Sequence, residues 1–384
     1  MRFPEFSGEW IESKLGDIAD FSKGAGISKD QRSEEGNPCI LYGELYTRYK
    51  SEVITNVFSK TALPDSELVK SKSNDIIIPA SGETAEDIAT ARCVPFDNIL
   101  LGGDLNIIRL HEQDGKFFSY QLNGVRKYDI ATVAQGVSVV HLHAGDLKGI
   151  IVKYPSHIAE QEKISQILGL IDDRIATQSK IIEELTALRS ALLEKVFQVS
   201  NPTLEVGAIA HQTSERNKLC RYSNVLSVSN RFGFINQSEQ FEDRNVASDD
   251  VRNYKVVHRG DFAYNPARIN VGSIAMLKSF ESGIVSPMYI CFQVDDTIVD
   301  PSFFELFLET KAFKDEMEIR LEGSVRRCLS FEALCEIHLP LPALLVQRSI
   351  SDKIGNISSK IKLEDRILRA YIRQKEWLLK QMFI

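Results

Sequence analysis

The stretch of sequence that decides the fold is ISQILGLIDDRIATQSKIIEELTALRSALLEKVF, residues 164–197, and residues 350–383 repeat its pattern as ISDKIGNISSKIKLEDRILRAYIRQKEWLLKQMF. In the first copy, alternate steps of three and four residues reach mostly large apolar side chains: Leu168, Ile171, Ile175, Gln178, Ile182, Leu185, Arg189, Leu192 and Val196. A shift of 186 residues gives the same spacing, with polar members at the same two places: Ile354, Ile357, Ile361, Glu364, Leu368, Tyr371, Lys375, Leu378 and Met382. An apolar period of 3.5 residues is typical of a coiled-coil seam, so we expect two long helices that pair within one chain.

The polar seam positions, Gln178, Arg189, Glu364 and Lys375, favour an antiparallel pair. In one antiparallel register Arg189 faces Glu364, Gln178 faces Lys375, and every other seam residue faces an apolar one. In a parallel pair Arg189 would face Lys375, which places like charges together in a dry seam. Matched polar pairs fix the register of a coiled coil. We therefore expect the antiparallel pair with an Arg189–Glu364 contact, unless the polar residues lie at exposed ends of the seam.

The repeat extends into the segments beside the helices. Matching positions in the first copy are Asp114, Phe117, Phe118, Gly136, Leu142, Leu147, Ile150, Pro155, Gln161, Ser165 and Gly169. Their counterparts in the second copy are Asp300, Phe303, Phe304, Gly323, Leu329, Leu334, Ile337, Pro342, Gln347, Ser351 and Gly355. A repeat of this length indicates tandem duplication of a whole domain plus its helix, and not a solenoid of short repeats.

The sequence therefore predicts an α+β fold of two similar globular domains, separated by two long helices that form an antiparallel coiled coil with pseudo-twofold symmetry. We expect four segments: a first globular domain at 1–157, a first spacer helix at 158–198, a second globular domain at 199–343 and a second spacer helix at 344–384. Short apolar runs between turn residues predict strands at 76–79, 99–101, 105–110, 149–154, 225–228, 255–257, 272–277 and 284–294. Helical spacing predicts helices at 117–133 and 301–321.

Composition and motifs argue against several classes of protein. The net charge is −7, although residues 345–384 carry nine basic and four acidic side chains, so any basic surface is local. The start of the chain has no apolar signal region, and the six cysteines form no C-x-x-C pair, so we expect a cytoplasmic protein with reduced thiols, no metal site and no membrane contact. Phosphate-loop, dinucleotide, zinc-protease and nucleophile-elbow motifs are absent from the sequence. This absence favours binding and positioning over catalysis.

Several segments, two of which recur in the same order, carry a resemblance to a known family. Each copy has a segment that begins with a glycine, at 136–142 and 323–330. Each also has a segment that leads from a proline through Gln161 or Gln347 into the long helix, at 153–164 and 339–350. Residues 6–10, 15–18 and 260–266 are family-like as well. The second copy lacks the usual glutamate before Gln347. Over nearly its whole length the chain resembles the specificity subunit of type I restriction–modification systems.

The resemblance implies a non-catalytic subunit of a methyltransferase and endonuclease complex. Each globular domain would be a target recognition domain that reads one half of a bipartite, asymmetric sequence in double-stranded DNA. The helices would be conserved spacers that set the distance between half-sites and dock two modification (methyltransferase) subunits, with restriction (translocase and nuclease) subunits able to join. The chain would bind no cofactor, because S-adenosylmethionine, ATP and Mg²⁺ belong to the partners. The alternative from the residues alone is a duplicated coiled-coil scaffold that binds proteins without DNA.

Basic, amide and hydroxyl side chains beside aromatic residues or in the family-like segments are our candidates for DNA contact. In the first domain they are Lys23, Tyr46, Arg48, Lys50, Ser81, Arg92, His141 and His143. In the second they are Asn230, Arg231, Arg268, Asn270, Arg326 and Arg327. His141 and His143 would share one face of a strand, but no third ligand is visible for a metal. For each candidate, an ordinary surface role is the alternative.

Overall fold

The protein divides into two compact units, each of which takes part of both long helices. The computed structural model describes residues 2–64, 66, 68–136, 139–198, 202–230, 232–237, 250–323 and 327–383. Unit 1 comprises Met1–Ile181 and Glu364–Ile384, and unit 2 comprises Ile182–Leu363. The helices are α6 (Ile158–Gln198) and α11 (Leu344–Met382). The sequence expectation treated each helix as a segment of its own, whereas the contacts assign one half of each helix to each unit.

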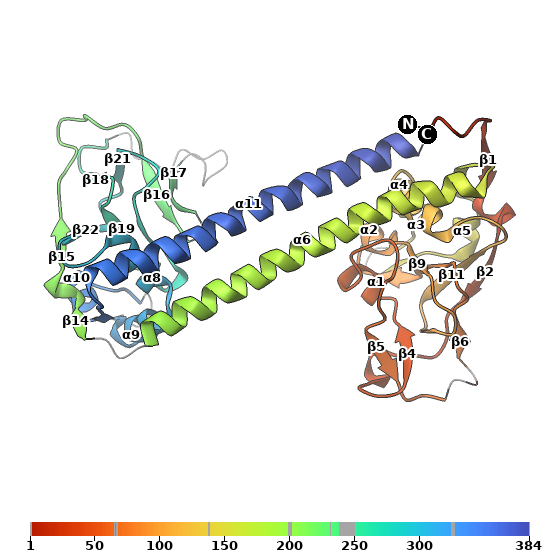
Figure 1. Cartoon of the computed structure of the whole chain (residues 1–384), viewed down its shortest axis with the longest axis horizontal. Helices are drawn as coiled ribbons and strands as arrows, with labels where there is room; N and C mark the ends of the chain where they lie inside the picture. Colours follow the sequence, from red (N-terminus) through yellow and green to blue (C-terminus); the bar gives the residue numbers. More distant parts are fainter. Residues whose placement is uncertain are drawn as a thin grey trace. The chain divides into compact units, whose positions relative to one another are not determined.

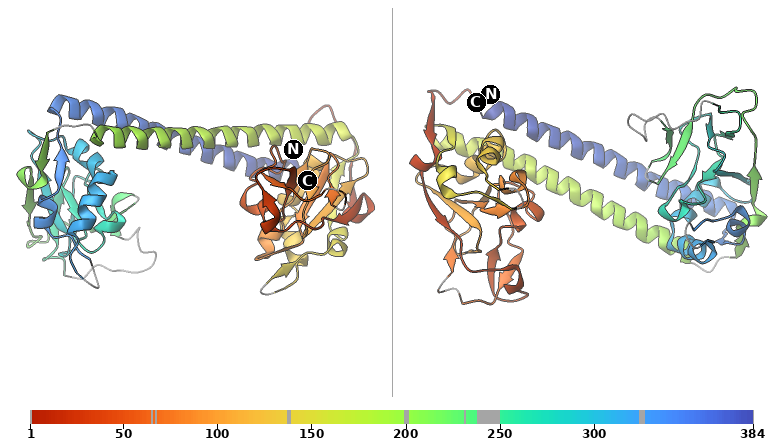
Figure 2. Two further views of the ribbon diagram at one scale, coloured as in Figure 1. Left: turned by 90° about the horizontal axis from the view of Figure 1, so that it is seen from below. Right: turned by 180° about the vertical axis from the view of Figure 1, so that it is seen from behind.

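Within each unit the α6 and α11 segments run side by side in opposite chain directions (Figures 1 and 2). All of the predicted seam residues are buried or half-buried, from Leu168 to Val196 and from Ile354 to Met382. The seam and the antiparallel direction are therefore confirmed. The seam forms because the 3.5-residue period keeps one apolar stripe of each helix facing the other helix.

The predicted register is wrong, however. In unit 1 the Gln178 side-chain amide donates to the Glu364 carboxylate and, over 3.2 Å, to the Glu364 carbonyl oxygen. In unit 2 the Arg189 Nε donates to the Ser358 hydroxyl over 2.7 Å and its Nη1 lies 2.8 Å from the Glu309 carboxylate. Arg189 therefore does not pair with Glu364, and Gln178 does not pair with Lys375. Carboxylates outside the seam series attract both cations: Glu309 pairs with Arg189, and Glu52 and Asp172 pair with Lys375.

Both units contain a central four-stranded antiparallel sheet with the same strand order. In unit 1 the order is β2 (Ala19–Lys23), β11 (Leu105–Leu110), β7 (Asp75–Pro79) and β9 (Arg92–Val94). In unit 2 it is β15 (Ala210–Thr213), β22 (Ile290–Val294), β19 (Phe262–Tyr264) and β20 (Ile274–Met276). A two-stranded ribbon leads into the long helix in each unit: β1 (Trp10–Lys14) with β13 (Ile151–Pro155), and β14 (Thr203–Glu205) with β23 (His338–Pro340). The matching order confirms the tandem duplication.

A pair of helices packs against each central sheet, where the sequence predicted one longer helix. In unit 1 these are α3 (Gly115–Asn123) and α4 (Lys127–Val133), and in unit 2 α8 (Pro301–Glu309) and α9 (Lys311–Arg320). The backbone of Gly124 leaves the helical region, with φ −89° and ψ −106°. Thr310 has extended backbone, and its hydroxyl accepts the Phe313 N–H to begin α9. Local capping therefore ended helices that apolar spacing alone extended too far.

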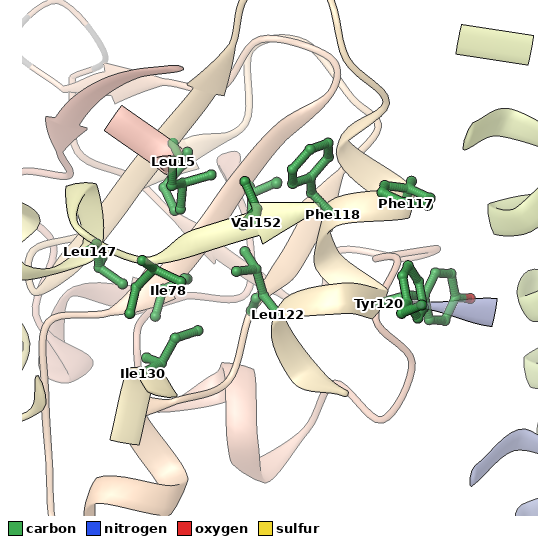
Figure 3. Close-up of a cluster of buried hydrophobic side chains, with 14 of the residues drawn as sticks. Leu15, Ile78, Phe117, Phe118, Tyr120, Leu122, Ile130, Leu147 and Val152 are labelled. Carbon is green, nitrogen blue, oxygen red and sulfur yellow. The ribbon is translucent and has the colours of Figure 1, made fainter. Parts of the chain in front are cut away.

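The core of each unit includes residues of the long helices. In unit 1 the buried cluster contains Phe117, Phe118 and Tyr120 of α3 together with Leu168 of α6 and Leu378 of α11. Figure 3 shows Phe118, Leu122 and Val152 close together inside this cluster. In unit 2 the cluster contains Phe303, Phe304 and Phe307 of α8 with Phe197 of α6 and Ile354 of α11. Burial of each large apolar side chain contributes roughly 1.5–3 kcal/mol.

The same hydrogen-bond network joins the long helix to the globular part in both units. In unit 1 the Asp114 N–H donates to Gln161 Oε1 over 3.0 Å, and the Ser165 hydroxyl donates to the Asp114 carboxylate over 2.6 Å. In unit 2 the Asp300 N–H donates to Gln347 Oε1 over 2.8 Å, and the Ser351 hydroxyl donates to the Asp300 carboxylate over 2.7 Å. The repeated Asp, Gln and Ser residues thus form one hydrogen-bond network in each unit, which we call the helix anchor.

The outer parts of the two units differ. Unit 1 has a five-stranded sheet of β3 (Arg32–Ser33), β5 (Ser59–Thr61), β4 (Asn37–Ile40), β10 (Leu100–Leu101) and β6 (Val69–Lys70), and a ribbon of β12 (Val140–His141) with β8 (Ser81–Gly82). The described part of unit 2 instead has two ribbons, β16 (Leu226–Ser229) with β17 (Gly233–Asn236) and β18 (Lys255–His258) with β21 (Ser282–Val285). The strand predicted at 284–294 is two strands, β21 and β22, because the 286–289 turn separates them.

Short helices complete the described structure. In unit 1 they are η1 (Leu15–Asp17), η2 (Lys29–Gln31), α1 (Glu44–Thr47), α2 (Ala85–Ile88) and α5 (Ala144–Lys148). In unit 2 they are η4 (Val206–Ala208), η5 (Ile269–Val271) and α10 (Phe331–Cys335). None of the helices within the described ranges combines the length and apolarity that crossing a membrane requires.

Candidate nucleic-acid interface

The described residues at the two ends of each glycine-initiated segment make equivalent backbone hydrogen bonds in the two units. In unit 1 Gln135 and His141 exchange backbone hydrogen bonds of 2.9 and 2.7 Å, and in unit 2 Glu322 and Cys328 exchange bonds of 2.9 and 2.8 Å. Each loop then joins the segment after a central strand, since the Leu142 N–H donates to Ala80 over 2.9 Å and the Leu329 N–H donates to Pro266 over 3.2 Å. The backbone hydrogen bonds on either side of the two segments therefore correspond between the units.

Gly136 and Gly323 are required by the backbone of these loops. Their φ angles are +129° and +105°, a region that side chains with a Cβ rarely adopt. A Cβ added to Gly136 would also lie 2.1 Å from the Val139 carbonyl oxygen. The repeated glycines of the sequence thus have a geometric cause.

In unit 1 the loop brings three of the candidate residues together. Ser81 and His141 are partners in the β8–β12 ribbon, and Ser81 is buried while His141 and His143 are exposed. The two imidazole rings lie 6.4 Å apart and nearly parallel, at 12°, as the alternation of the sequence indicates. Within the described residues, no three His, Cys, Asp or Glu side chains are grouped in a way that could hold a metal ion. The exposed imidazoles are free to donate or accept hydrogen bonds at a groove edge.

A hollow of about 880 Å³ lies beside the Gly-rich turn at residues 24–26 of unit 1. Its lining brings Tyr46 and Arg48 from the candidate residues together with Tyr42, Lys29 and Arg32. Burial raises the pKa of the Tyr46 hydroxyl, so Tyr46 remains a neutral donor. Arg48 lies 4.9 Å from the centre of the Phe58 ring and 3.1 Å from the buried Glu44 carboxylate. Cations beside aromatic rings suit a phosphate backbone with stacked bases.

The remaining candidates in unit 1 have different surroundings. Lys23, at the end of β2, is exposed, and so is Lys50, whose ammonium donates to the Thr47 carbonyl over 3.3 Å. Arg92 is buried, and its guanidinium donates to the carbonyl oxygens of Tyr49 and Ala91 over 2.9 and 3.1 Å. A buried guanidinium is poorly placed to reach a phosphate or a base edge, so this structure argues against DNA contact by Arg92. The sequence placed Arg92 on the surface because arginine is seldom buried.

In unit 2 three candidates converge on one set of loops. Asn230, Arg268 and Asn270 are exposed, and a Cβ added to Gly272 would lie 3.3 Å from the Asn230 Cβ. Within the described residues the Arg268 side chain has no acidic partner, whereas Arg327 pairs with Glu318 over 2.8 Å. Arg231 and Arg326 lie outside the described residues. The structure therefore favours Arg268 over Arg327 as a free cation.

Sequence reasoning missed several residues of these surfaces. In unit 1 they are the lining residues Lys29, Arg32 and Tyr42, and in unit 2 the exposed apolar residues Phe232, Val271 and Met288. Lys29 and Arg32 adjoin the Gly-rich turn at 24–26, which is a signal that the sequence does contain. The apolar residues carry no such signal, because exposure of a single apolar side chain is decided by tertiary structure.

Comparisons with known proteins agree with this architecture. Residues 7–187 match the family model of the type I restriction modification DNA specificity domain. The type I restriction enzyme MjaVIII specificity subunit of Methanocaldococcus jannaschii is 23% identical over 401 aligned residues, covering 95% of this chain and 89% of that protein.

Two solved structures share the fold. The type I restriction–modification S subunit from M. genitalium has a TM-score of 0.65 at 18% identity, covering 100% of this chain and 99% of that chain. A chain from a structure of complex assembly and conformational transition of the type I restriction–modification system has a TM-score of 0.55 at 13% identity, covering 99% and 98%. Residues 7–187 thus resemble the type I restriction modification DNA specificity domain, and nearly the whole chain is similar to a type I specificity subunit and shares the fold of a solved S subunit.

Proposed function

We propose that the chain selects the DNA sequence on which a type I restriction–modification complex acts. In this proposal unit 1 reads one half of a bipartite target in double-stranded DNA and unit 2 reads the other half. The observation that carries the proposal is the combination of one shared frame with two different outer parts. Central sheet, helix pair and helix anchor match between the units, whereas the outer strands do not. Two different readers on one repeated frame suit an asymmetric two-part sequence.

The long helices are proposed to dock two modification subunits and to set the spacing between half-sites. Large apolar side chains on the helices remain exposed, namely Leu170 and Trp377 in unit 1 and Leu188 and Leu363 in unit 2. Their exposed fractions of 46–57% favour a protein partner on the outer helix faces. Restriction subunits would join this assembly. S-adenosylmethionine, ATP and Mg²⁺ would bind to the partners, and the chain itself would perform no catalysis.

Methylation mapping tests this proposal. The chain is expressed with its modification subunits in cells that lack other DNA methylation, and methylated positions are mapped on the host genome. We expect methylation in a bipartite sequence with a spacer of fixed length, and none when the chain is omitted. A hybrid in which residues 202–340 come from a relative should change one half-site only. Stable assembly with modification subunits but without sequence-dependent methylation would favour the protein scaffold instead.

A further inference from the structure

Three loops of unit 2 each expose a large apolar side chain. The loops are 230–232 between β16 and β17, 265–273 between β19 and β20, and 286–289 between β21 and β22. The side chains are Phe232, Val271 and Met288, with exposed fractions of 68, 51 and 62%. We call these three residues the apolar loop cluster. Large apolar side chains exposed on neighbouring loops indicate a binding surface.

Hydrogen bonds to one buried residue hold the three loops together. The Val228 N–H donates to the Tyr289 hydroxyl over 3.3 Å, and the Ser273 hydroxyl donates to the Val228 carbonyl over 3.0 Å. Val228 precedes the first loop, Ser273 ends the second and Tyr289 ends the third. All three residues are buried. Val228, Ser273 and Tyr289, at the bases of the loops, are therefore held together before any ligand binds, which lowers the entropic cost of binding.

Further contacts extend along the exposed surface of the loops. The first and second loops touch where a Cβ on Gly272 would lie 3.3 Å from the Asn230 Cβ. The second and third touch where the Asn265 amide lies 3.7 Å from the Met288 sulfur. Asn230, Asn265 and Arg268 thus lie beside the apolar loop cluster. Amide and guanidinium groups are those that make paired hydrogen bonds to adenine and guanine.

The charge of the loops is unlike that of the whole chain. The chain has 53 acidic residues and a net charge of −7, yet residues 230–232, 265–273 and 286–289 contain no Asp or Glu and two arginines. A surface without acidic side chains suits a polyanion, since no carboxylate opposes its approach. The β16–β17 ribbon that presents Phe232 is also an element that a major groove, about 12 Å wide, admits.

Resting on the proposed function, we propose that the apolar loop cluster reads thymine methyl groups in the major groove of the half-site bound by unit 2. The C5 methyl of thymine is the apolar feature that the major groove offers to a protein, and apolar side chains recognise it by contact. The neighbouring asparagines and Arg268 recognise purines by hydrogen bonding. The unit 2 half-site therefore contains at least one thymine whose methyl group adds to binding.

Deoxyuridine substitution tests the contact directly. The complex of the chain with its modification subunits is used with a duplex that carries its mapped target. Each thymine of the unit 2 half-site is replaced in turn by deoxyuridine, which removes the methyl group and leaves every hydrogen-bonding group. We expect binding to weaken about fourfold at one or more positions, as for the loss of one buried methyl group.

Alanine variants identify the side chain that makes the contact. Phe232→Ala, Val271→Ala and Met288→Ala are each titrated with the thymine and deoxyuridine duplexes. The variant that has lost the contact binds both duplexes equally, whereas the other variants keep the parent's preference. Leu219→Ala is the matched control, because Leu219 is a 73% exposed apolar residue of unit 2 outside the three loops. This control should keep the full preference for thymine.

The outcomes separate this inference from the function on which it rests. A complex that binds no sequence specifically would remove the proposed function. A complex that binds its target but ignores every deoxyuridine, or whose unit 2 half-site lacks thymine, would overturn the methyl contact alone. A preference for thymine that survives in all three alanine variants would likewise assign the methyl contact to other residues.

Discussion

At the scale of single residues, Lys375 of α11 lies at the centre of a buried ionic cluster in unit 1. Its ammonium contacts the Glu52 carboxylate and lies 2.6 Å from the Asp172 carboxylate. The hydroxyls of Tyr120 and Ser51 donate to Asp172 over 2.7 and 2.9 Å. Lys375 is 13% exposed, and both carboxylates are still less so. This one side chain therefore joins α11, α6 and the globular part of unit 1.

Lys375→Met should destabilise unit 1 by about 3–5 kcal/mol, because two buried carboxylates lose their cation. The methionine keeps most of the apolar stem, so the loss reports on charge rather than on packing. The measurement is urea unfolding monitored by hydrogen exchange of the backbone amides in α3, which belongs to unit 1. Lys380→Met, at an exposed position of the same helix, is the matched control. Equal stability of the two variants would contradict the role of Lys375.

Glu52→Gln should stabilise unit 1 near neutral pH, whereas Lys375→Met should destabilise it. Burial raises the pKa of the Glu52 carboxyl, and Lys375 lowers it by less. A carboxyl whose pKa is higher in the folded state favours folding when protonated and loses that contribution as pH rises through the folded pKa. The variant should therefore gain stability relative to the parent as the pH rises from about 4 to about 8. Chemical unfolding at both pH values measures this, and a larger loss at the higher pH would contradict it.

Arg268→Ala should weaken DNA binding by the complex. If the guanidinium contacts a phosphate, binding weakens for all sequences, and the slope of log K against the logarithm of the salt concentration decreases in magnitude by about one. If it contacts guanine, discrimination at one base pair falls by about 1–3 kcal/mol and the salt slope is retained. Fluorescence titration at several salt concentrations distinguishes the two contacts. Arg259→Ala, an exposed arginine of unit 2 outside the loops, is the control, and identical binding by both variants would exclude Arg268.

At the scale of elements, the helix anchors predict equivalent behaviour of the two units. Asp114→Ala and Asp300→Ala each remove the cap of one helix, α3 or α8, and the acceptor of one serine on a long helix. Loss of a helix cap costs about 1–2 kcal/mol. Each variant should therefore show faster hydrogen exchange in its own capped helix and not in the other. Asp296→Ala is the control, and equal effects on both helices would show that the anchors are not local.

At the scale of the whole molecule, the proposed spacing role of the helices can be tested by lengthening both together. Seven residues inserted after Ala187 in α6 and seven after Ser359 in α11 preserve the 3.5-residue seam. Each helix gains about 10.5 Å, which is about three base-pair steps of B-DNA at roughly 3.4 Å each. Methylation mapping should find the same half-sites with a spacer longer by about three base pairs. Changed half-sites with the old spacer would overturn the spacing role.

Four-residue insertions at the same two places are the matched comparison. They add about 6 Å to each helix, but they shift the apolar stripe out of phase with its partner. We expect these variants to lose the paired seam and to methylate poorly. A defect in the four-residue variant alone assigns the effect to seam phase, whereas equal activity of both variants would show that the seam tolerates a change of phase.

The sequence by itself determined the features that depend on periodicity and repetition. Apolar residues such as Leu168 and Ile354 recur every 3.5 positions, which is sufficient to place two long helices and the stripe that each buries. The repeated Asp114 and Asp300 indicated the duplication, and the glycine-initiated segments indicated the resemblance to type I specificity subunits. These features are local or recur at a fixed offset, so they can be read from one chain without knowing what packs against it.

Only the tertiary structure decided the features that join distant residues. One partner of Lys375 is Glu52, which lies far from either helix in the sequence, so the pairing of this seam cation could not be read from the helices alone. Arg92 is buried because backbone carbonyls surround it, and Phe232 and Met288 are exposed because anchored loops hold them outward. Burial, pairing of charges and convergence of loops arise from contacts across the fold. No pattern within a single segment carries that information.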